Sequence, residues 1–368
     1  MYFTGVSASR QSAPTLTVTG CKLHSTASEL GGGHLFHVGG KVVATVTPGA
    51  LAGGIYTLSA VKIGPIFEVT GSGALHVNGG IFDGNNVNDL GSLVNASGTS
   101  SVVFDAVTVR NIPGINASSF GVFTITGSSA VTPTVLTLQN GTTLDNFDPS
   151  NTYATAGIRL GGSVNVTLDN ATISKGPQPI VGTISDSTIT LKGGTKITNN
   201  LYGMTLTFSG GTNAVNMNGA TFSNNVNGGN IPSLYITGTS SGTVAATLTN
   251  ATFTANTRAI GVNVTSLKMR SCSVTGNGSY GVEVINIGAT AAVVDLGKVG
   301  DLGGNTLSGN TTGNLHTLTG GVIDAVGNTW DVSTQGSDAA GHYATPTQKT
   351  GVQSGQNYTT NAGSTINF

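Results

Sequence analysis

Residues 193–225 read GGTKITNNLYGMTLTFSGGTNAVNMNGATFSNN and contain one unit twice. Residues 193–200 and 218–225 each consist of a small-residue turn, one large apolar residue, a small polar residue and two asparagines. Between them lies an alternating run at 204–208, closed by Ser-Gly-Gly. Apolar side chains at every second position indicate half-buried strands, and clusters of Gly and Asn indicate turns. The stretch therefore predicts short strands joined by tight turns.

The large apolar residue of this unit, which we call the anchor, returns along most of the chain. From residue 197 to residue 307 the steps between anchors are 25, 31, 21 and 33 residues. A constant strand core joined by loops of changing length indicates a parallel β-helix rather than a regular solenoid. One further, poorly matched coil is expected around residues 53–56. The anchors are Leu23, Phe82, Val109, Leu144, Ile173, Ile197, Phe222, Phe253, Val274, Leu307 and Trp330.

Other positions of the unit repeat with the anchor. The residue two before it is mostly small and is expected to face inward as well. Strand-like runs, for example at 67–69, 157–160 and 281–284, precede the anchors, so each coil should supply two or three short strands. Stacked about 4.8 Å apart, eleven or twelve coils predict a rigid rod roughly 50–60 Å long.

An asparagine three residues after the anchor is the most specific signal. It occurs at Asn85 and then on five consecutive coils. Stacked amides can hydrogen-bond from coil to coil, and Asn tolerates the left-handed backbone of tight turns. We therefore predict an asparagine ladder formed by Asn200, Asn225, Asn256, Asn277 and Asn310.

This ladder resembles that of the right-handed parallel β-helix, or pectin-lyase-like, superfamily. The resemblance covers residues 15–330 and implies an all-β fold, a single-stranded right-handed parallel β-helix of eleven to twelve coils. It leaves function open, because that superfamily includes lyases, hydrolases, phage tailspikes, adhesins and inert scaffolds. The run from 303 to 331 is similar to the last coils of bacterial exported β-helix proteins without assigned chemistry. We divide the chain into an N-terminal segment or cap (1–14), the β-helix (15–335) and a C-terminal cap or tail (336–368).

The composition narrows the possible partners. Charged residues make up 8% of the 368 residues and the formal net charge is −1, with no basic cluster of the kind that binds nucleic acid. No apolar run approaches the roughly 18 residues of a membrane span, so membrane insertion is not expected. The low charge and the abundance of Thr, Ser, Asn and Gly favour an extracellular or cell-surface protein. Residues 1–5 do not resemble a signal peptide, so an export signal is expected to lie outside this sequence.

The motifs of known polysaccharide-degrading β-helices are missing. Sites that resemble those of pectate lyases contain clustered Asp residues that hold Ca²⁺ beside a basic residue. Sites that resemble those of polygalacturonases contain an Asn-Thr-Asp run, an Asp-Asp pair and a Gly-His-Gly run. No two acidic residues are neighbours in this sequence, and its only glutamates are Glu29, Glu68 and Glu283. A glycosidase needs two carboxyl groups within about 5–9.5 Å. We therefore expect no enzymatic activity, with a lyase or hydrolase site of unrecognised type as the alternative.

Three charged residues directly follow anchors. Asp83, Arg110 and Asp145 should stack on successive coils, as a substrate clamp or as an acid–base–acid ladder that relieves repulsion between like charges. The ladder is the better interpretation, because an Arg between two carboxylates lowers their pKa and makes either a poor acid.

A second set of residues is expected to form an exposed stripe along the strands that precede the anchors: Glu68, Arg159, Tyr235, Glu283 and His316. Such a face can bind polysaccharide weakly or be merely solvated. His34 and His37, with His24 and His76 nearby, lack further ligands at metal-binding spacing, so neither a metal nor another cofactor is expected.

Thr-x-Thr pairs at 124–126, 188–190, 205–207 and 247–249 raise an ice-binding alternative. Such a face needs the pairs in one row on consecutive coils, whereas their offsets from the anchors differ. Threonine is also simply a good strand residue.

We therefore expect an exported structural protein, a filament subunit or an adhesin. Residues 1–14 and 364–368 contain strand-like segments that could pair head-to-tail with another copy. Cys21 and Cys272 occupy the same inward position near opposite ends of the stack, too far apart for a disulfide.

Overall fold

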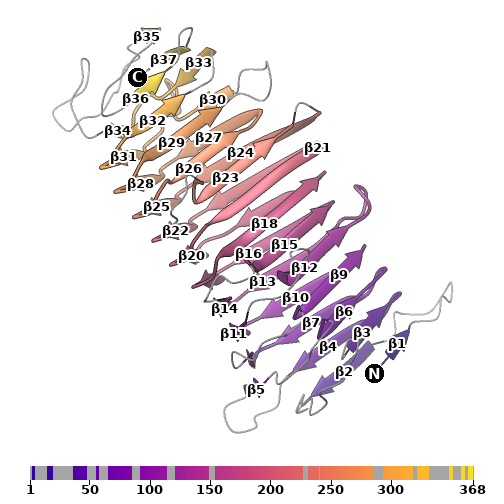
Figure 1. Ribbon diagram of the computed structural model, residues 1–368. Helices are drawn as coiled ribbons and strands as arrows, with labels where there is room; N and C mark the ends of the chain where they lie inside the picture. Colours follow the sequence, from indigo (N-terminus) through magenta and orange to yellow (C-terminus); the bar gives the residue numbers. More distant parts are fainter. Residues whose placement is uncertain are drawn as a thin grey trace. The chain divides into compact units, whose positions relative to one another are not determined.

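The computed structural model describes residues 2–4, 15–19, 36–47, 55–57, 65–84, 92–113, 121–148, 154–226, 231–239, 241–285, 293–317, 321–330, 348–350, 358–360 and 364–367. They belong to two compact units, residues 1–187 and 188–368, which we describe separately. The ordered elements found in these ranges are all β-strands. Figure 1 shows how strands follow one another from coil to coil within each unit.

Each coil contributes strands to up to three parallel sheets, which we call A, B and C. In the N-terminal unit, sheet A contains β1 (Tyr2–Thr4), β3 (Phe36–Gly39), β6 (Phe67–Val69), β9 (Val94–Gly98), β12 (Gly121–Gly127), β15 (Ala156–Gly162) and β18 (Gln178–Ser185). Sheet B contains β2 (Thr15–Thr19), β4 (Val43–Thr47), β7 (Ala74–Asn78), β10 (Ser101–Asp105), β13 (Thr134–Gln139) and β16 (Val164–Asp169). Sheet C contains β5 (Ile55–Thr57), β8 (Ile81–Asp83), β11 (Thr108–Ile112), β14 (Thr143–Phe147) and β17 (Thr172–Ser174).

The C-terminal unit repeats this plan. Its sheet A contains the first half of β21 (Met204–Asn218), then β23 (Leu234–Gly238), β26 (Ile260–Asn263), β29 (Tyr280–Ile285), β32 (Gly313–Thr317) and β36 (Tyr358–Thr360). Sheet B contains β19 (Thr188–Leu191), the second half of β21, β24 (Gly242–Thr249), β27 (Ser266–Arg270), β30 (Val293–Asp295), β33 (Gly321–Asp324), β37 (Ser364–Asn367) and β35 (Gln348–Thr350). Sheet C contains β20 (Lys196–Thr198), β22 (Thr221–Ser223), β25 (Thr252–Thr254), β28 (Ser273–Thr275), β31 (Thr306–Ser308) and β34 (Thr329–Trp330).

The anchors form the inward row of sheet C in both units. Phe82 pairs in register with Val109, and Ile197 with Phe222, and the same pairing continues along each unit. Tyr56 of β5 pairs with Phe82, which confirms the additional coil expected near residues 53–56. Leu23 lies outside the described residues. With five sheet C strands in one described unit and six in the other, the predicted parallel β-helix is confirmed.

Left-handed backbone flanks most of the described anchors. The residue three before the anchor has positive φ, for example Ala106 (54°), Gly219 (79°) and Asn250 (52°), and so has the residue two after it, for example Asn146 (54°) and Asn224 (53°). Because only Gly and, at lower cost than others, Asn adopt this conformation readily, a three-residue strand ends sharply at both sides. The Gly and Asn content of the chain follows from these two turns in each coil.

Aliphatic and aromatic side chains fill the interior of each unit. In the N-terminal unit, the rings of Phe67, Phe82, Phe104 and Phe123 contact one another with centroid distances of 5.0–6.4 Å. In the C-terminal unit, Phe222 and Phe253 stack at 5.0 Å. Because adjacent coils repeat at the spacing of strands, like residues on successive coils can stack in this way.

The asparagine ladder is confirmed in the C-terminal unit. The Nδ2 atom of each ladder residue donates to the Oδ1 atom of the next, from Asn200 through Asn225, Asn256 and Asn277 to Asn310, at 2.8–3.1 Å. All five are nearly inaccessible to solvent. The left-handed residue is the one before each of them, such as Asn199 (57°) and Asn224 (53°), so the expectation that the ladder residue itself is left-handed was wrong. Asn85 lies outside the described residues.

In the N-terminal unit the same corner is apolar. Ile112 and Phe147 are paired in register at the position that Asn occupies in the other unit, and both are fully buried. On the next coil the position is Gly176, where an added Cβ would lie 2.0 Å from the Phe147 ring. The corner is therefore closed by hydrophobic packing here and by amide hydrogen bonds in the C-terminal unit.

The C-terminal segment is part of the stack. β36 pairs with β32 and β37 pairs with β33, both in parallel, so they extend sheets A and B. β35 then pairs with β37 in the antiparallel direction. The strand at 364–367 thus has a partner along both edges, and the expectation that it offers a free edge for head-to-tail pairing was wrong. At the other end, the predicted strand within residues 1–14 is β1, which pairs with β3.

Candidate functional site

The predicted stripe occupies one outer row of sheet A in each unit. In the N-terminal unit the row runs, in register, through His37, Glu68, Asn95, Thr124, Arg159 and Val181. In the C-terminal unit it runs through Thr205, Tyr235, Gly261, Glu283, His316 and Thr359. The structure therefore brings Glu68 and Arg159 into one row and Tyr235, Glu283 and His316 into another.

The stripe is less exposed than expected. Glu283 is 8% exposed, and Glu68, Arg159, Tyr235 and His316 are only partly accessible. Neighbouring side chains on successive coils cover one another, because charged and aromatic groups in this row pair along the stack. The five side chains thus lie on the outward row, as expected, but they are partly covered, and Glu283 is buried.

Glu283 lies at the centre of the best-defined cluster of this row. One carboxylate oxygen accepts a hydrogen bond from Arg258 Nη2 at 2.9 Å, and the other lies 3.0 Å from His316 Nδ1. The Tyr280 ring stacks on the His316 ring at 4.2 Å, and the Arg258 guanidinium carbon lies 5.7 Å from the Tyr280 centroid. Hydrogen bonding to His316 and the nearby charge of Arg258 hold the pKa of Glu283 below its ordinary value, against the opposing effect of burial. The cluster stabilises an ionised carboxylate and so disfavours a catalytic acid at Glu283.

Tyr235 lies apart from this cluster in the row. Gly261 separates it from Glu283, and a Cβ at Gly261 would lie 2.4 Å from Pro232 Cγ and 3.3 Å from Tyr235 Cδ2. The missing side chain is therefore replaced by Pro232 and Tyr235, which pack over the glycine.

A related pair lies in the N-terminal unit. His37 Nδ1 lies 2.8 Å from Glu68 Oε2, and His37 Nε2 lies 3.3 Å from the Thr70 hydroxyl. A Cβ at Gly39 would lie 2.8 Å from His37 Nε2, so the imidazole ring uses the space above this glycine. His76 belongs to sheet B rather than to this group, and His24 and His34 lie outside the described residues.

The residues of the charge ladder stack as predicted but pair differently. Arg110 is in register with Asp83 on one side and with Asp145 on the other. Its Nε donates to Asp83 Oδ2 at 2.7 Å, whereas Asp145 accepts from Ser174 Oγ at 2.7 Å and from Lys175 Nζ at 3.2 Å. The carboxylates are thus neutralised by cations on adjacent coils, one each, rather than by a shared arginine.

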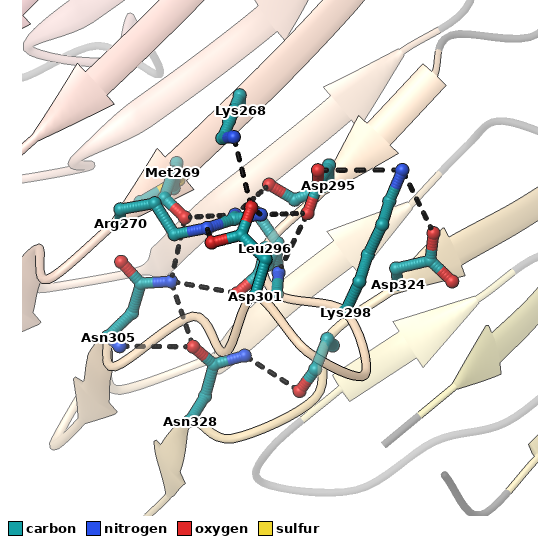
Figure 2. A network of polar contacts seen from close by, with 12 residues as sticks. Lys268, Met269, Arg270, Asp295, Leu296, Lys298, Asp301, Asn305, Asp324 and Asn328 are labelled. Carbon is teal, nitrogen blue, oxygen red and sulfur yellow. Dashed lines mark hydrogen bonds and ion pairs between the residues drawn. The ribbon is translucent and has the colours of Figure 1, made fainter.

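A larger charged network, which the sequence analysis missed, lies on the outer face of sheet B in the C-terminal unit (Figure 2). Arg270 of β27 is at its centre and its side chain is 12% exposed. Nη1 donates to the Met269 carbonyl at 2.8 Å and to the Asp295 carbonyl at 3.2 Å, and Nη2 donates to Asp295 Oδ1 at 2.8 Å. These bonds fix the plane of the guanidinium.

Asp301 completes the network from a turn between β30 and β31. Arg270 donates to it twice, through Nε at 3.0 Å and through Nη2 at 2.7 Å, and Lys268 Nζ lies 3.1 Å away. Hydrogen bonds from Arg270 and then Lys268 are the main reason that the pKa of Asp301 is lowered, and the bond to Asp301 raises the pKa of Arg270. Lys298 lies 3.5 Å from Asp295 and 3.7 Å from Asp324. Three cations and three carboxylates thus alternate on this face.

Only the register reveals this network. Lys268, Asp295 and Asp324 form one row across β27, β30 and β33, although they are 27 and 29 residues apart in sequence. A search for neighbouring acidic residues in the sequence therefore cannot find them. Lys268 and Asp324 both precede their anchors, Val274 and Trp330, by six residues (274 − 268 and 330 − 324), so alignment on the anchors could have placed these two in one row. Asp295 precedes Leu307 by twelve residues (307 − 295), because the turn that carries Asp301 lies between them.

Inside the stack, next to this network, lies a second short asparagine ladder (Figure 2). Asn305 Nδ2 donates to Asn328 Oδ1 at 2.8 Å and to the Leu296 carbonyl at 3.0 Å. Asn305 Oδ1 accepts from the Cys272 backbone N–H at 2.9 Å. Both asparagines are completely buried, and they supply hydrogen-bond partners for the buried backbone groups beneath the turn.

The threonine pairs of the C-terminal unit do not form an unbroken row. Thr190 and Thr247 share a row of sheet B, but Asn216 lies between them and Lys268 follows. Thr205 and Thr207 lie on sheet A. The register of these strands therefore does not favour the ice-binding alternative.

In the described part of the chain, no group of three or more His, Cys, Asp or Glu side chains is placed to hold a metal ion. Nor do those residues include a helix with the length and apolar character required to cross a membrane.

Comparison of the chain with protein-family models, with characterised proteins and with solved structures yields no match. The function must therefore be argued from the fold and from the contacts described above.

Proposed function

We propose that the chain is an exported or cell-surface structural protein of the pectin-lyase-like β-helix superfamily, acting as a filament subunit or an adhesin. The right-handed parallel stack, the extracellular location and the structural role all belong to this proposal. It includes at most weak binding of polysaccharide on the outer row of sheet A, around Tyr235, Glu283 and His316.

The observation that carries the proposal is the pairing of carboxylates with cations on adjacent coils. Asp83, Asp145, Glu283 and Asp301 each contact an Arg or Lys in the described part of the chain. A glycosidase instead requires one carboxyl group kept protonated near a second, ionised one. An adjacent cation favours the ionised form, so these groups are suited to hold coils together rather than to transfer protons.

The test is incubation of the purified chain with a panel of neutral and acidic polysaccharides. We expect no release of reducing ends and no formation of unsaturated uronates. Turnover of any polymer that is lost in Glu283→Gln or Glu68→Gln would overturn the proposal in favour of the enzymatic alternative. Electron microscopy of the same preparation tests the filament role, for which we expect concentration-dependent assemblies rather than single chains.

A further inference from the structure

We infer that Thr70, His37 and Glu68 form a nucleophilic relay on the outer face of sheet A, in which the Thr70 hydroxyl takes up the acyl group of short-chain esters. The inference goes beyond the proposed structural role, does not depend on it, and departs from the expectation of no enzymatic activity. It rests on a hydroxyl–imidazole–carboxylate chain, on backbone N–H groups beside it that donate to no other group, and on the space that a glycine leaves.

The register of β3 and β6 brings the three side chains together. The two strands pair in parallel with His37 opposite Glu68, and Thr70 follows directly after β6 (Figure 1). His37 Nδ1 lies 2.8 Å from Glu68 Oε2, and His37 Nε2 lies 3.3 Å from Thr70 Oγ1. One imidazole thus contacts a carboxylate through one nitrogen and a hydroxyl through the other. Nucleophilic catalysis requires this arrangement, in which a third group orients the base that activates the nucleophile.

The carboxylate determines which ring nitrogen is the base. An ionised carboxylate only accepts hydrogen bonds, so Glu68 favours the neutral imidazole with its proton on Nδ1. Nε2 then has the free lone pair, and the Thr70 hydroxyl donates to it. His37 can therefore take the proton of Thr70 as the hydroxyl attacks a carbonyl carbon. The contact of 3.3 Å is long for a hydrogen bond, as catalytic contacts often are before a substrate binds.

Two stacked glycines lie beside the hydroxyl. Gly71 follows Thr70 directly, and Gly40 lies on the preceding coil, with φ of 62° and 65°. A Cβ on Gly71 would lie 3.5 Å from Gly40 N, so the two backbones are close. Both glycines are exposed, and within the described residues neither of their N–H groups donates a hydrogen bond. Paired backbone N–H groups of this kind can stabilise the oxyanion that forms when a hydroxyl attacks an ester.

A third glycine leaves room at the reacting atoms. A Cβ on Gly39 would lie 2.8 Å from His37 Nε2 and 3.4 Å from Thr70 Oγ1, so any side chain there would crowd both the base and the nucleophile. Thr70 is partly accessible, and the His37 side chain is 20% exposed, so an ester can reach the hydroxyl from solvent. The space is that of one missing side chain, which suits a small acyl group such as acetyl better than a long one.

The related pair of the C-terminal unit does not complete such a relay. The residue two after Glu283, which corresponds to Thr70, is Ile285. Arg258 also binds the Glu283 carboxylate directly. The hydroxyl therefore distinguishes the N-terminal pair from its counterpart.

The reaction proceeds in two steps. Thr70 Oγ1 attacks the carbonyl carbon of the ester, and its proton passes to His37 Nε2. The bond between this carbon and the alcohol oxygen breaks, the alcohol leaves with the proton from Nε2, and acyl-Thr70 remains. Water then attacks the acyl-Thr70 ester, its proton passes through Nε2 to Thr70 Oγ1, and the carboxylic acid is released. Glu68 stabilises the transient imidazolium without taking its proton.

The test is incubation of the full chain with p-nitrophenyl acetate, followed by acid quenching during turnover and peptide mass spectrometry. We expect an acetyl group on Thr70 and release of p-nitrophenol above the rate in buffer. Thr70→Val keeps the shape of the side chain but lacks the hydroxyl, so it should lose the acetyl adduct and lower kcat/KM by about tenfold or more. His37→Gln should lower kcat/KM by a similar factor, because general bases typically contribute about 10²–10⁴-fold. Thr70→Ser should keep both the adduct and the turnover.

Glu68→Gln tests the positioning role of the carboxylate. Glu68 orients the base but does not touch the ester, so its substitution should lower kcat and leave KM unchanged. Thr237→Val is the matched control. Thr237 also lies on the outer face of sheet A, but its hydroxyl donates to Thr207 Oγ1 at 3.2 Å and to the Leu206 carbonyl at 3.3 Å. Its removal should change neither acetylation nor turnover.

Acetylation confined to lysines or to the chain terminus, or equal turnover by wild type and Thr70→Val, would refute the relay. Should circular dichroism show that Thr70→Val does not fold, the acetylated peptides of wild type and Thr70→Ser decide in its place. Cleavage of an acetyl ester produces neither reducing ends nor unsaturated uronates. Failure of the relay therefore leaves the proposed structural role unaffected, and the two tests can be told apart.

Discussion

At the scale of single residues, the fold depends on backbone conformation as much as on side-chain polarity. Most of the described anchors of sheet C have a left-handed residue on either side, as Gly219 and Asn224 lie on either side of Phe222. Where Ala takes such a position, as at Ala106 and Ala255, it does so at a cost of roughly 1–2 kcal/mol. The surrounding parallel pairing holds these residues in place.

Cys272 gives a residue-scale prediction. Cys272 is 2% exposed, and its Sγ atom lies 3.4 Å from the Leu248 and Arg270 carbonyl oxygens. Burial raises the pKa of the Cys272 thiol to about 11, so little thiolate exists at neutral pH. We expect native protein at pH 8 to leave Cys272 unmodified by iodoacetamide, as measured by peptide mass spectrometry. Rapid native labelling would contradict the buried position. Cys21 lies outside the described residues, so the expectation that Cys21 and Cys272 form no disulfide stays a prediction.

Glu283 gives a second prediction, on pH dependence. Its pKa is lowered in the folded protein, so its ionised form stabilises the fold above the unfolded pKa of about 4.3, and this contribution is lost as pH falls through the folded pKa. Glu283→Gln should reduce the free energy of unfolding by about 1–3 kcal/mol at pH 7, measured by urea titration. The difference from wild type should shrink below about pH 4. Glu68→Gln is the comparison, since the Glu68 side chain is 27% exposed against 11% for Glu283 and should matter less. A difference that persists unchanged in acid would contradict the role of the charge.

At the scale of elements, the asparagine ladder is the clearest target. Asn225 donates to Asn256 Oδ1 and to the Ile197 carbonyl, and its Oδ1 accepts from Asn200. Asn225→Ala would leave these buried groups without partners, which should cost on the order of 1–3 kcal/mol of unfolding free energy. Asn216→Ala, an exposed site on the outer face of β21, is the control and should change stability by less than about 0.5 kcal/mol. Similar effects of the two substitutions would show that the ladder does not stabilise the stack.

The strands were predictable from sequence to the extent that one coil resembles the next. The described anchors, small inward residues such as Ala220 and Ala251, and the ladder from Asn200 to Asn310 repeat at fixed offsets and are buried. The charged network around Arg270 was not predictable in the same way, because its members come from strands and a turn joined by loops of unequal length. The exposure of the stripe was not predictable for another reason. Alternation along a strand predicts that Glu283 faces outward, but it does not predict that Arg258, Tyr280 and His316 cover it.

At the scale of the whole chain, the C-terminal strands determine which edges remain available. β37 is paired on both sides, by β33 and by the antiparallel β35. The edge of sheet B at this end is therefore the short strand β35, which runs antiparallel to the other strands. A short antiparallel edge strand limits pairing with further copies. Association through the coil ends therefore has to use other edges than the one first expected.

Deletion of residues 348–368 tests this capping role. The shortened chain loses the partners of β32 and β33, so their backbone groups become open to pairing with a second copy. We expect it to associate at concentrations where the full chain does not, as measured by multi-angle light scattering. A shortened chain that stays monomeric while retaining its β-sheet circular dichroism would show that these strands do not protect the edge.

The asparagine ladder has one more consequence, which follows from its direction. Every link runs the same way, from the Nδ2 atom of one asparagine to the Oδ1 atom of the next coil, and the last continues from Asn310 to Asn314. The amide dipoles therefore add along the ladder, as peptide dipoles add along a helix. Each amide is polarised by its neighbours, so a central link such as that between Asn225 and Asn256 is stronger than an isolated pair of the same geometry. The C-terminal unit thus contains a one-way chain of aligned dipoles within its buried interior.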